Sequence, residues 1–288
     1  PSEDFLNLRD SNLSPDFYAS MQQFQELYDF TTAPKDIDGI IAINTHFVLS
    51  MMNVLGPIEA QGTKFTTTEV DACKCPQIIY ELERYADEPV AFEKGDRKGI
   101  IGVLMQQMLG KTFDAPQSTW PGLITTMLSS LQQKDVILMF KDKNSQEAIE
   151  KVNFGGRLYK YDGDYLAINE ANFGGAKSNM YIEQKVKQVV KKDQNKIVKK
   201  ITVDYKYPRK MDNCSLERKG GLCLAGIYKS WIRFYVPLGS ELIKASGTEV
   251  AITKTEDLGK TVFDGFFTLR PEGTAKIELE YSIPINPK

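Results

Sequence analysis

Apolar residues follow two different patterns along the chain, and the change falls near residue 183. Before it, stretches with apolar residues every three or four positions alternate with short continuous apolar runs, a pattern typical of helices and buried strands. Apolar residues at helical spacing follow Ser14 and Thr45, further helices are expected from Asp96 and over 116–133, and the apolar runs are 39–43 and 135–140. Strands that alternate with helices predict parallel pairing, so we expect an α/β domain, an α/β/α sandwich, over residues 1–182.

The expected ends of these helices rest on residues that cap helices or stop them. Ser14, Pro15 and Asp16 predict an N-cap, a first helical residue and an acidic first turn. Thr45 is the expected cap of the next helix, and Gly56-Pro57 ends that helix.

From residue 183 onward, almost every segment alternates polar and apolar residues, as strands do. Turns containing Pro-Leu-Gly, Asp-Leu-Gly and Pro-Glu-Gly separate these segments. About seven strands in roughly 105 residues match the size of an immunoglobulin-like β-sandwich. We therefore expect a β-sandwich domain over residues 183–288.

Length and charge restrict the classes of partner. A chain of 288 residues exceeds the usual size of one domain and favours two. With 36 basic and 38 acidic residues, the net charge of -2 gives no general attraction for nucleic acid, and we expect no nucleic-acid partner. The basic segment 185–200 alternates Lys with Val and Ile, which indicates a solvated sheet face.

The ends of the sequence and its apolar segments bear on the membrane. The most apolar stretch, 40–55, is interrupted by Asn44, His46 and Asn53 and is too short to span a bilayer. The chain opens with Pro1 rather than Met, so we expect the first residues of the gene product to lie upstream. An export signal and a membrane anchor are then expected outside these residues.

The four cysteines form two close pairs. Cys214 and Cys223 flank a Gly-Gly turn, which predicts a disulfide that closes a loop, with free buried thiols as the alternative. Cys73 and Cys75 are separated by one residue and form the second candidate disulfide, through a strained ring. A zinc site needs about four ligands at suitable spacing, and the chain has one histidine, so we expect no metal at the cysteines.

Two charged clusters at expected helix starts are the candidate ligand site. Arg9 offers a planar fork for phosphate or carboxylate oxygens, and Asp10 beside it can orient that fork or hold a cation such as magnesium. Asp96, Arg97 and Lys98 form a second cluster, where free backbone N–H groups also favour an anion. The alternatives are a structural Arg–Asp pair at the first cluster and a solvated first turn at the second.

Other candidate motifs favour structural roles. His46 falls in the first turn of a helix, and without a second histidine a Ser-His-Asp triad is not supported. The glycine-rich segment 172–179 permits a backbone nest for anions, but a tight turn explains it more simply. Gly110-Lys111-Thr112 lacks the upstream glycine of a phosphate-binding loop.

Several of these segments together resemble an uncharacterised bacterial family, a domain of unknown function found in anchored envelope proteins. The matching stretches are Leu8–Phe17, Asp38–Ile43, Leu55–Ile58, Ala171–Asn179 and Phe234–Ser240. They occur in the family's order and span most of the chain. The resemblance implies an outward-facing, extracellular protein of the cell surface.

A more distant likeness is to the LytR-CpsA-Psr phosphotransferases, which attach glycopolymers to the cell wall. Leu8-Arg9-Asp10 is similar to their Pro-Arg-Asp segment, which binds a lipid-linked pyrophosphate, and Gly95–Lys98 is similar to their Gly-Asp helix start. A second Arg and an Arg-Gln pair of that family are not matched. This likeness implies a polyprenyl-pyrophosphate-linked glycan as ligand.

Two hypotheses about function follow. In the first, Arg9 and Arg97 clamp phosphate oxygens while Asp10 and Asp96 orient them or hold a divalent metal, and the protein binds or transfers a glycopolymer. In the second, the protein is a non-catalytic surface or assembly module whose partners are other envelope proteins. Spatial convergence of the two charged clusters distinguishes the hypotheses.

Overall fold

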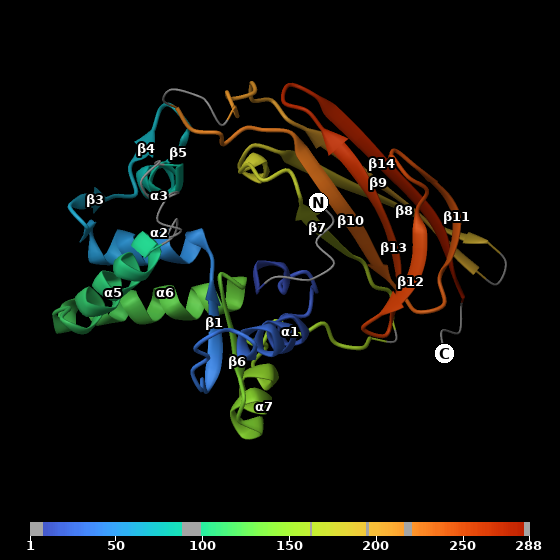
Figure 1. Cartoon of the computed structure of the whole chain (residues 1–288). Helices are drawn as coiled ribbons and strands as arrows, with labels where there is room; N and C mark the ends of the chain where they lie inside the picture. The colour runs from blue at the N-terminus through green and yellow to red at the C-terminus, as the bar shows by residue number, and fades with distance from the viewer. Residues whose placement is uncertain (1–7, 88–98, 162, 194–195, 216–220, 285–288) are drawn as a thin grey trace. The chain divides into compact units, whose positions relative to one another are not determined.

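The computed structural model describes residues 8–87, 99–161, 163–193, 196–215 and 221–284 (Figure 1). Helices make up 31% and strands 35% of the chain, which makes it a mixed helix-and-sheet protein. The chain forms two compact units, Pro1–Arg157 and Leu158–Lys288. All pairings between described strands are antiparallel.

Unit 1 is built from helices around several small β-ribbons. Its elements are η1 (Leu8–Asp10), α1 (Phe17–Asp29), β1 (Gly39–Ile43), α2 (Thr45–Leu55), β2 (Ile58–Ala60), β3 (Thr63–Phe65), β4 (Glu69–Val70), β5 (Cys75–Pro76), α3 (Gln77–Asp87), α5 (Gly99–Phe113), η2 (Gln117–Thr119), α6 (Trp120–Gln133), β6 (Val136–Phe140) and α7 (Lys143–Lys151). The apolar runs predicted as strands are therefore strands.

The direction of those two strands differs from the prediction. Strand β1 pairs with β6 antiparallel, with Gly39 opposite Phe140, and the sheet has two strands. The expectation of parallel strands is wrong, because a continuous apolar run specifies burial and leaves strand direction open. The ribbon is also less enclosed than expected, since Ile41 is 64% exposed.

The two faces of this ribbon contact different apolar clusters. Met139 and Ile137 of β6 join a small cluster with Phe17 and Met21 of α1. The alternate residues of β6 face the larger core of unit 1, which is formed mainly by α2, α3, α5 and α6. Because successive side chains of a strand point to opposite faces, five residues of β6 connect the two clusters.

Helices α1 and α2 begin at different caps from those expected. Asp16, not Ser14, caps α1, and its carboxylate accepts a hydrogen bond from the backbone N–H of Ala19 at 3.0 Å. Asn44, not Thr45, caps α2. The sequence offered two adjacent capping residue types in each case, and local spacing did not distinguish them.

Unit 2 consists almost entirely of strands. Its elements are β7 (Ala167–Asn172), η3 (Ser178–Met180), β8 (Glu183–Asp193), β9 (Lys196–Lys206), β10 (Tyr228–Val236), β11 (Glu241–Ser246), β12 (Thr253–Asp257), β13 (Lys260–Leu269) and β14 (Thr274–Pro284). They form two four-stranded sheets, in the orders β12-β13-β10-β7 and β11-β14-β9-β8.

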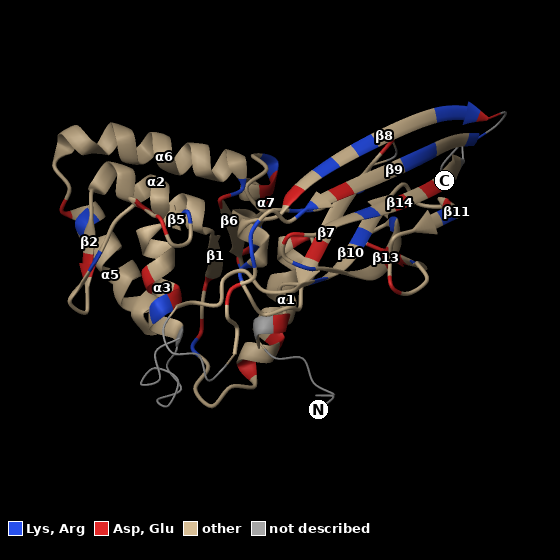
Figure 2. Cartoon of the chain, turned by 90° about the horizontal axis from the view of Figure 1, so that it is seen from above, with Lys and Arg blue, Asp and Glu red and all other residues tan. Residues whose placement is uncertain are grey.

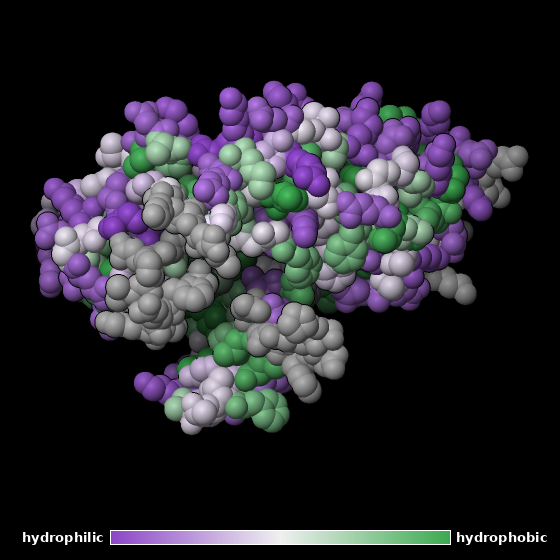
Figure 3. All heavy atoms as spheres, turned by 45° about the horizontal axis from the view of Figure 1, so that its top comes forward, coloured by the Kyte–Doolittle hydropathy of each residue, from purple (hydrophilic) through white to green (hydrophobic). Residues whose placement is uncertain are grey.

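One hydrophobic core serves both of these sheets. Ile232, Phe234 and Phe267 from the first sheet and Ile201 and Tyr281 from the second belong to the same buried cluster. Alternate residues of β9 and β14 supply this core, as the alternating pattern of these segments predicts, whereas β8 and β12 are exposed along their full length. Elsewhere, apolar side chains also reach the surface of the molecule (Figure 3).

The second unit begins earlier in the chain than the predicted domain boundary at residues 182 and 183. Strand β7 pairs with β10, with Asn172 opposite Ser230, and so belongs to the first sheet of unit 2. Residues 158–182 were expected in the first domain. The partner strand of β7 lies about sixty residues further along the chain, so local sequence patterns give no sign of the pairing.

We expect Phe234→Ala to destabilise unit 2 by about 3–5 kcal/mol, because it opens a cavity at a residue with 0% exposure in the centre of the core. Chemical denaturation followed by circular dichroism measures this change. Val190→Ala, at an exposed position, is the control and should stay within about 0.5 kcal/mol of the wild type. A loss below about 1 kcal/mol for Phe234→Ala would contradict this description of the core.

Candidate functional site

The predicted anion site is only partly described by the structure. Arg9 and Asp10 lie in η1, ahead of α1, and Asp10 is half-buried. The side chain of Arg9 and residues Asp96, Arg97 and Lys98 lie outside the described residues. The convergence of the two charged clusters therefore stays a prediction.

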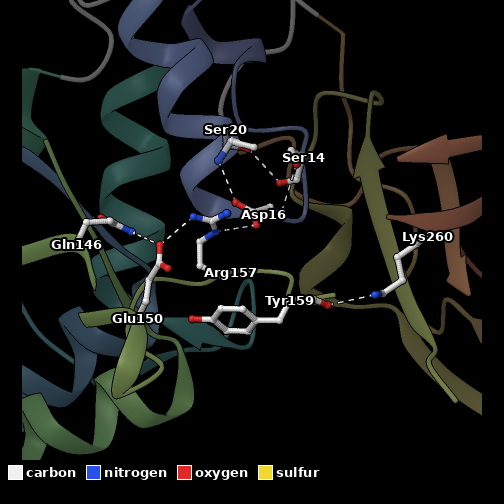
Figure 4. A network of polar contacts seen from close by, with 9 residues as sticks. Ser14, Asp16, Ser20, Gln146, Glu150, Arg157, Tyr159 and Lys260 are labelled. Carbon is white, nitrogen blue, oxygen red and sulfur yellow. Dashed lines mark hydrogen bonds and ion pairs between the residues drawn. The ribbon is translucent and has the colours of Figure 1, made fainter. Parts of the chain in front are cut away.

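The start of α1 has a polar network that sequence reasoning did not identify (Figure 4). Asp16 is 1% exposed, and its second carboxylate oxygen accepts a hydrogen bond from Nε of Arg157 at 3.0 Å. Arg157 also donates through Nη1 to Glu150 at 2.8 Å, and Gln146 donates to the same glutamate oxygen at 2.7 Å. One arginine thus joins the start of α1 to the end of α7.

The charge of Arg157 is held in this network from several sides. Burial opposes the charge, but the bonds and charges of Asp16 and Glu150 outweigh burial and raise the pKa of Arg157 above its usual value. The guanidinium also lies over the ring of Tyr18, at 4.7 Å from the ring centre. The contacts of Arg157 hold it to α1 and α7, which favours a structural role.

Unit 2 has a second polar cluster, centred on Glu170 of β7. Its carboxylate accepts hydrogen bonds from Tyr205 at 2.7 Å, Tyr228 at 2.6 Å, Gln184 at 2.6 Å and Ser230 at 3.1 Å. Burial, and then the neighbouring carboxylate, raise the pKa values of both tyrosines, so their hydroxyls stay protonated donors. These neutral donors satisfy the partly buried carboxylate and tie β7 to β8, β9 and β10.

Strand β8 is a charged and accessible edge strand. It lies at the edge of the second sheet, pairs only with β9, and is exposed along all 11 residues. Lys185, Lys187, Lys191 and Lys192 lie on it, and none of them has an ion pair with a described residue. Figure 2 shows the basic residues along β8 and β9 as blue bands.

The edge strand also exposes apolar side chains. Val186 and Val190 pair in register with Val203 and Lys199 of β9, on the side of the sheet that faces the core. Both valines are nevertheless exposed, because no strand of the other sheet covers them. An open row of backbone groups with exposed valines and lysines is the surface that an added strand requires.

Both predicted disulfides are present. Cys73 bonds to Cys75 in the turn between β4 and β5, and Cys214 bonds to Cys223. All four cysteines of the chain are therefore oxidised. The prediction of two cysteine pairs is confirmed.

The remaining candidate residues do not assemble into a described site. His46 is exposed on the first turn of α2. Within the described ranges, no group of three or more histidine, cysteine or acidic side chains is arranged to hold a metal ion. A search of the same ranges finds no helix with the length and apolar character needed to cross a bilayer.

Comparison with protein families gives one match. Residues 2–74 are similar to a family described as a protein of unknown function, DUF4012. This region runs from η1 to β4 and the turn that follows it, and includes Arg9 and Asp10. No curated protein matches the chain. The match supports an uncharacterised family, and the LytR-CpsA-Psr likeness stays a prediction.

We expect Arg157→Ala to destabilise unit 1 by about 3–5 kcal/mol, because Asp16 would remain buried without its charged partner. Urea denaturation measures the change. The control is Lys141→Ala, which removes the partner of the fully exposed Asp36 and should change stability far less, because solvent screens this ion pair. Equal small losses in both variants would show that the Asp16 network is not a structural requirement.

Proposed function

We propose that this protein is a non-catalytic assembly module of the cell surface, and that β8 binds an extended, acidic segment of a partner protein. The observation behind this proposal is the open edge of β8, which pairs on one side only and is exposed along its full length.

The proposed location follows from the disulfides. Such bonds form and persist in oxidising environments and are rare in the cytosol. An extracellular location of the protein also agrees with the resemblance to envelope proteins. In the same proposal, unit 2 is an immunoglobulin-like sandwich, supported by two antiparallel four-stranded sheets around one core.

The charge of β8 favours one kind of partner. An exposed edge strand is prone to pair with any other strand, and lysines on the edge discourage that. Two copies of β8 side by side would bring lysines against lysines, so pairing with a second copy of this edge is unfavourable. An acidic strand would instead gain both backbone hydrogen bonds and opposite charges.

The test uses a fluorescent peptide of about ten residues in which glutamate and valine alternate, the pattern of an added strand. We expect binding that weakens at high salt, and protection of the amides of residues 183–193 from hydrogen exchange. The double variant Lys187→Glu and Lys191→Glu should bind at least about tenfold more weakly, because it reverses two charges facing the peptide.

Two controls make this experiment decisive. Lys210→Glu changes an exposed lysine of the same unit outside the strands and should bind as the wild type does. A peptide with proline at its centre cannot complete the ladder of backbone hydrogen bonds and should not bind. Equal binding of the proline peptide would rule out strand addition.

The second candidate is the binding of a polyprenyl-pyrophosphate-linked glycan by unit 1, and a property of α5 favours it. Ile101, Leu109 and Phe113 of α5 are exposed apolar residues, and with half-buried Met105 they recur at every fourth position. They form a stripe of roughly 18 Å along the helix. Asp96, Arg97 and Lys98 directly precede this helix in the sequence. If a pyrophosphate binds at the N-terminus of α5, the attached lipid chain can lie along the apolar stripe.

For this candidate we expect Arg97→Ala and Arg9→Ala each to weaken binding of undecaprenyl pyrophosphate by roughly 10- to 100-fold, because each removes charge-assisted hydrogen bonds. Binding in detergent micelles, with and without magnesium, is the measurement. Lys35→Ala, at an exposed lysine, is the control. Affinities equal to that of the wild type in both arginine variants would exclude a phosphate clamp.

A further inference from the structure

Unit 2 exposes a group of aromatic side chains on the outer face of its first sheet. Trp231 of β10 lies opposite Phe266 of β13, and their rings are stacked at 6.1 Å with 10° between the planes. Phe173, just after β7, packs its ring at 6.5 Å from that of Phe266. Phe266 is 43% and Phe173 57% exposed, although the core of the unit lies on the other face of the sheet. Clustered aromatic residues that remain accessible indicate a binding surface.

The aromatic group is held in place before any ligand arrives. The indole N–H of Trp231 donates to Asp264 at 3.1 Å, and Thr253 donates to the same carboxylate at 2.7 Å. The guanidinium of Arg233 lies over the Trp231 ring, at 4.1 Å from the ring centre. Rings that are fixed in this way lose little conformational entropy when a ligand binds.

A polar hollow lies directly beside these rings. Lys229 and Thr268 face each other across β10 and β13, two residues from the Trp231–Phe266 pair and on the same face of the sheet. With Glu249, Arg270 and Thr274 they line a hollow of about 570 Å³. The Lys229–Thr268 pair is two residues from the Trp231–Phe266 pair, which corresponds to about 7 Å along the strands.

The charged groups of the hollow are available to a ligand. Lys229, Glu249 and Arg270 are exposed, and none of them has an ion pair or a side-chain hydrogen bond with any described residue. They supply two cationic donors and one anionic acceptor, beside the hydroxyls of Thr268 and Thr274. The hollow is within the range of volumes that hold a ligand of drug size, which is about that of a short oligosaccharide.

This combination matches the chemistry of a sugar chain. A pyranose ring has an apolar face of C–H groups, which packs on an aromatic ring, and a rim of hydroxyls, which need donors and acceptors. The excess of one positive charge among Lys229, Arg270 and Glu249 favours a sugar that bears a carboxylate. A single-stranded nucleic acid would need a continuous basic groove along its backbone, and Glu249 and Asp264 oppose that.

We propose that the hollow beside Phe173 and Phe266 binds an acidic glycan, with pyranose faces on the two phenylalanine rings and the carboxylate toward Lys229 and Arg270. This site involves β10, β13, the first residue of β14 and the neighbouring loops, and none of its residues belongs to β8, where the proposed partner strand pairs. The inference therefore goes beyond the proposed function and does not rest on it.

The test is the binding of a hexamer of mannuronic acid to the whole chain, followed by the fluorescence of Trp231 in a Trp120→Phe background. The chain has two tryptophans, so this background isolates the one beside the site. We expect saturable binding that Phe266→Ala and Phe173→Ala each weaken at least tenfold. Lys229→Ala should weaken binding of this acidic hexamer and leave any binding of neutral chitohexaose unchanged.

Matched controls separate a binding site from general apolar adhesion. Phe30→Ala removes a phenylalanine that is 89% exposed in the other unit and should leave binding unchanged. Thermal unfolding of each variant shows whether unit 2 remains folded, since Phe173 and Phe266 lie outside its buried core. No binding of the acidic hexamer, equal binding by Phe266→Ala, or stronger binding of an oligothymidine would each overturn the proposal.

Discussion

Unit 2 depends on one constraint, which is that its two four-stranded antiparallel sheets share a single buried apolar core. Strands β9, β10, β13 and β14 supply this core, and the side chains between their core residues point to the opposite face of each sheet. Both proposed interaction surfaces lie outside the core. Strand β8 is exposed along its full length, and the hollow is lined by outward residues of β10 and β13 together with Glu249 and Arg270, which lie outside the strands. The core therefore fixes where a ligand can bind, without specifying which ligand.

Buried charge is handled differently in the two units. In unit 1, the carboxylate of Asp16 is matched by the cationic Arg157, and the pair links segments at opposite ends of the unit's sequence. In unit 2, Glu170 is surrounded by neutral donors, with Tyr205 and Tyr228 among them. Both arrangements satisfy the rule that a buried charge needs hydrogen-bonding partners. Asp16, Arg157 and Glu170 therefore have structural roles, since each holds separate segments of its unit together.

The open edge of β8 and the aromatic hollow offer different kinds of recognition. A strand edge binds through backbone groups, which every extended peptide has, so selectivity must come from the lysines. The hollow instead presents fixed rings and free charged side chains, which favour a rigid ligand with an apolar face. No residue that lines the hollow belongs to β8, so the proposed peptide and the proposed glycan have separate sites on unit 2.

The sequence by itself determined the features that depend on neighbours in the chain. Alternation predicted most strands of unit 2, helical spacing predicted α1 and α2, and the Gly-Gly turn between Cys214 and Cys223 predicted the bond between them. Tertiary structure alone decided which distant segments meet: the antiparallel pairing of β1 with β6, the place of β7 beside β10, and the contact of Asp16 with Arg157. The aromatic hollow belongs to this second group, since Phe173 and Phe266 are far apart in sequence. Local sequence patterns indicate which residues are buried and which backbone conformation they favour. The pairing of distant segments depends instead on the packing of the whole unit.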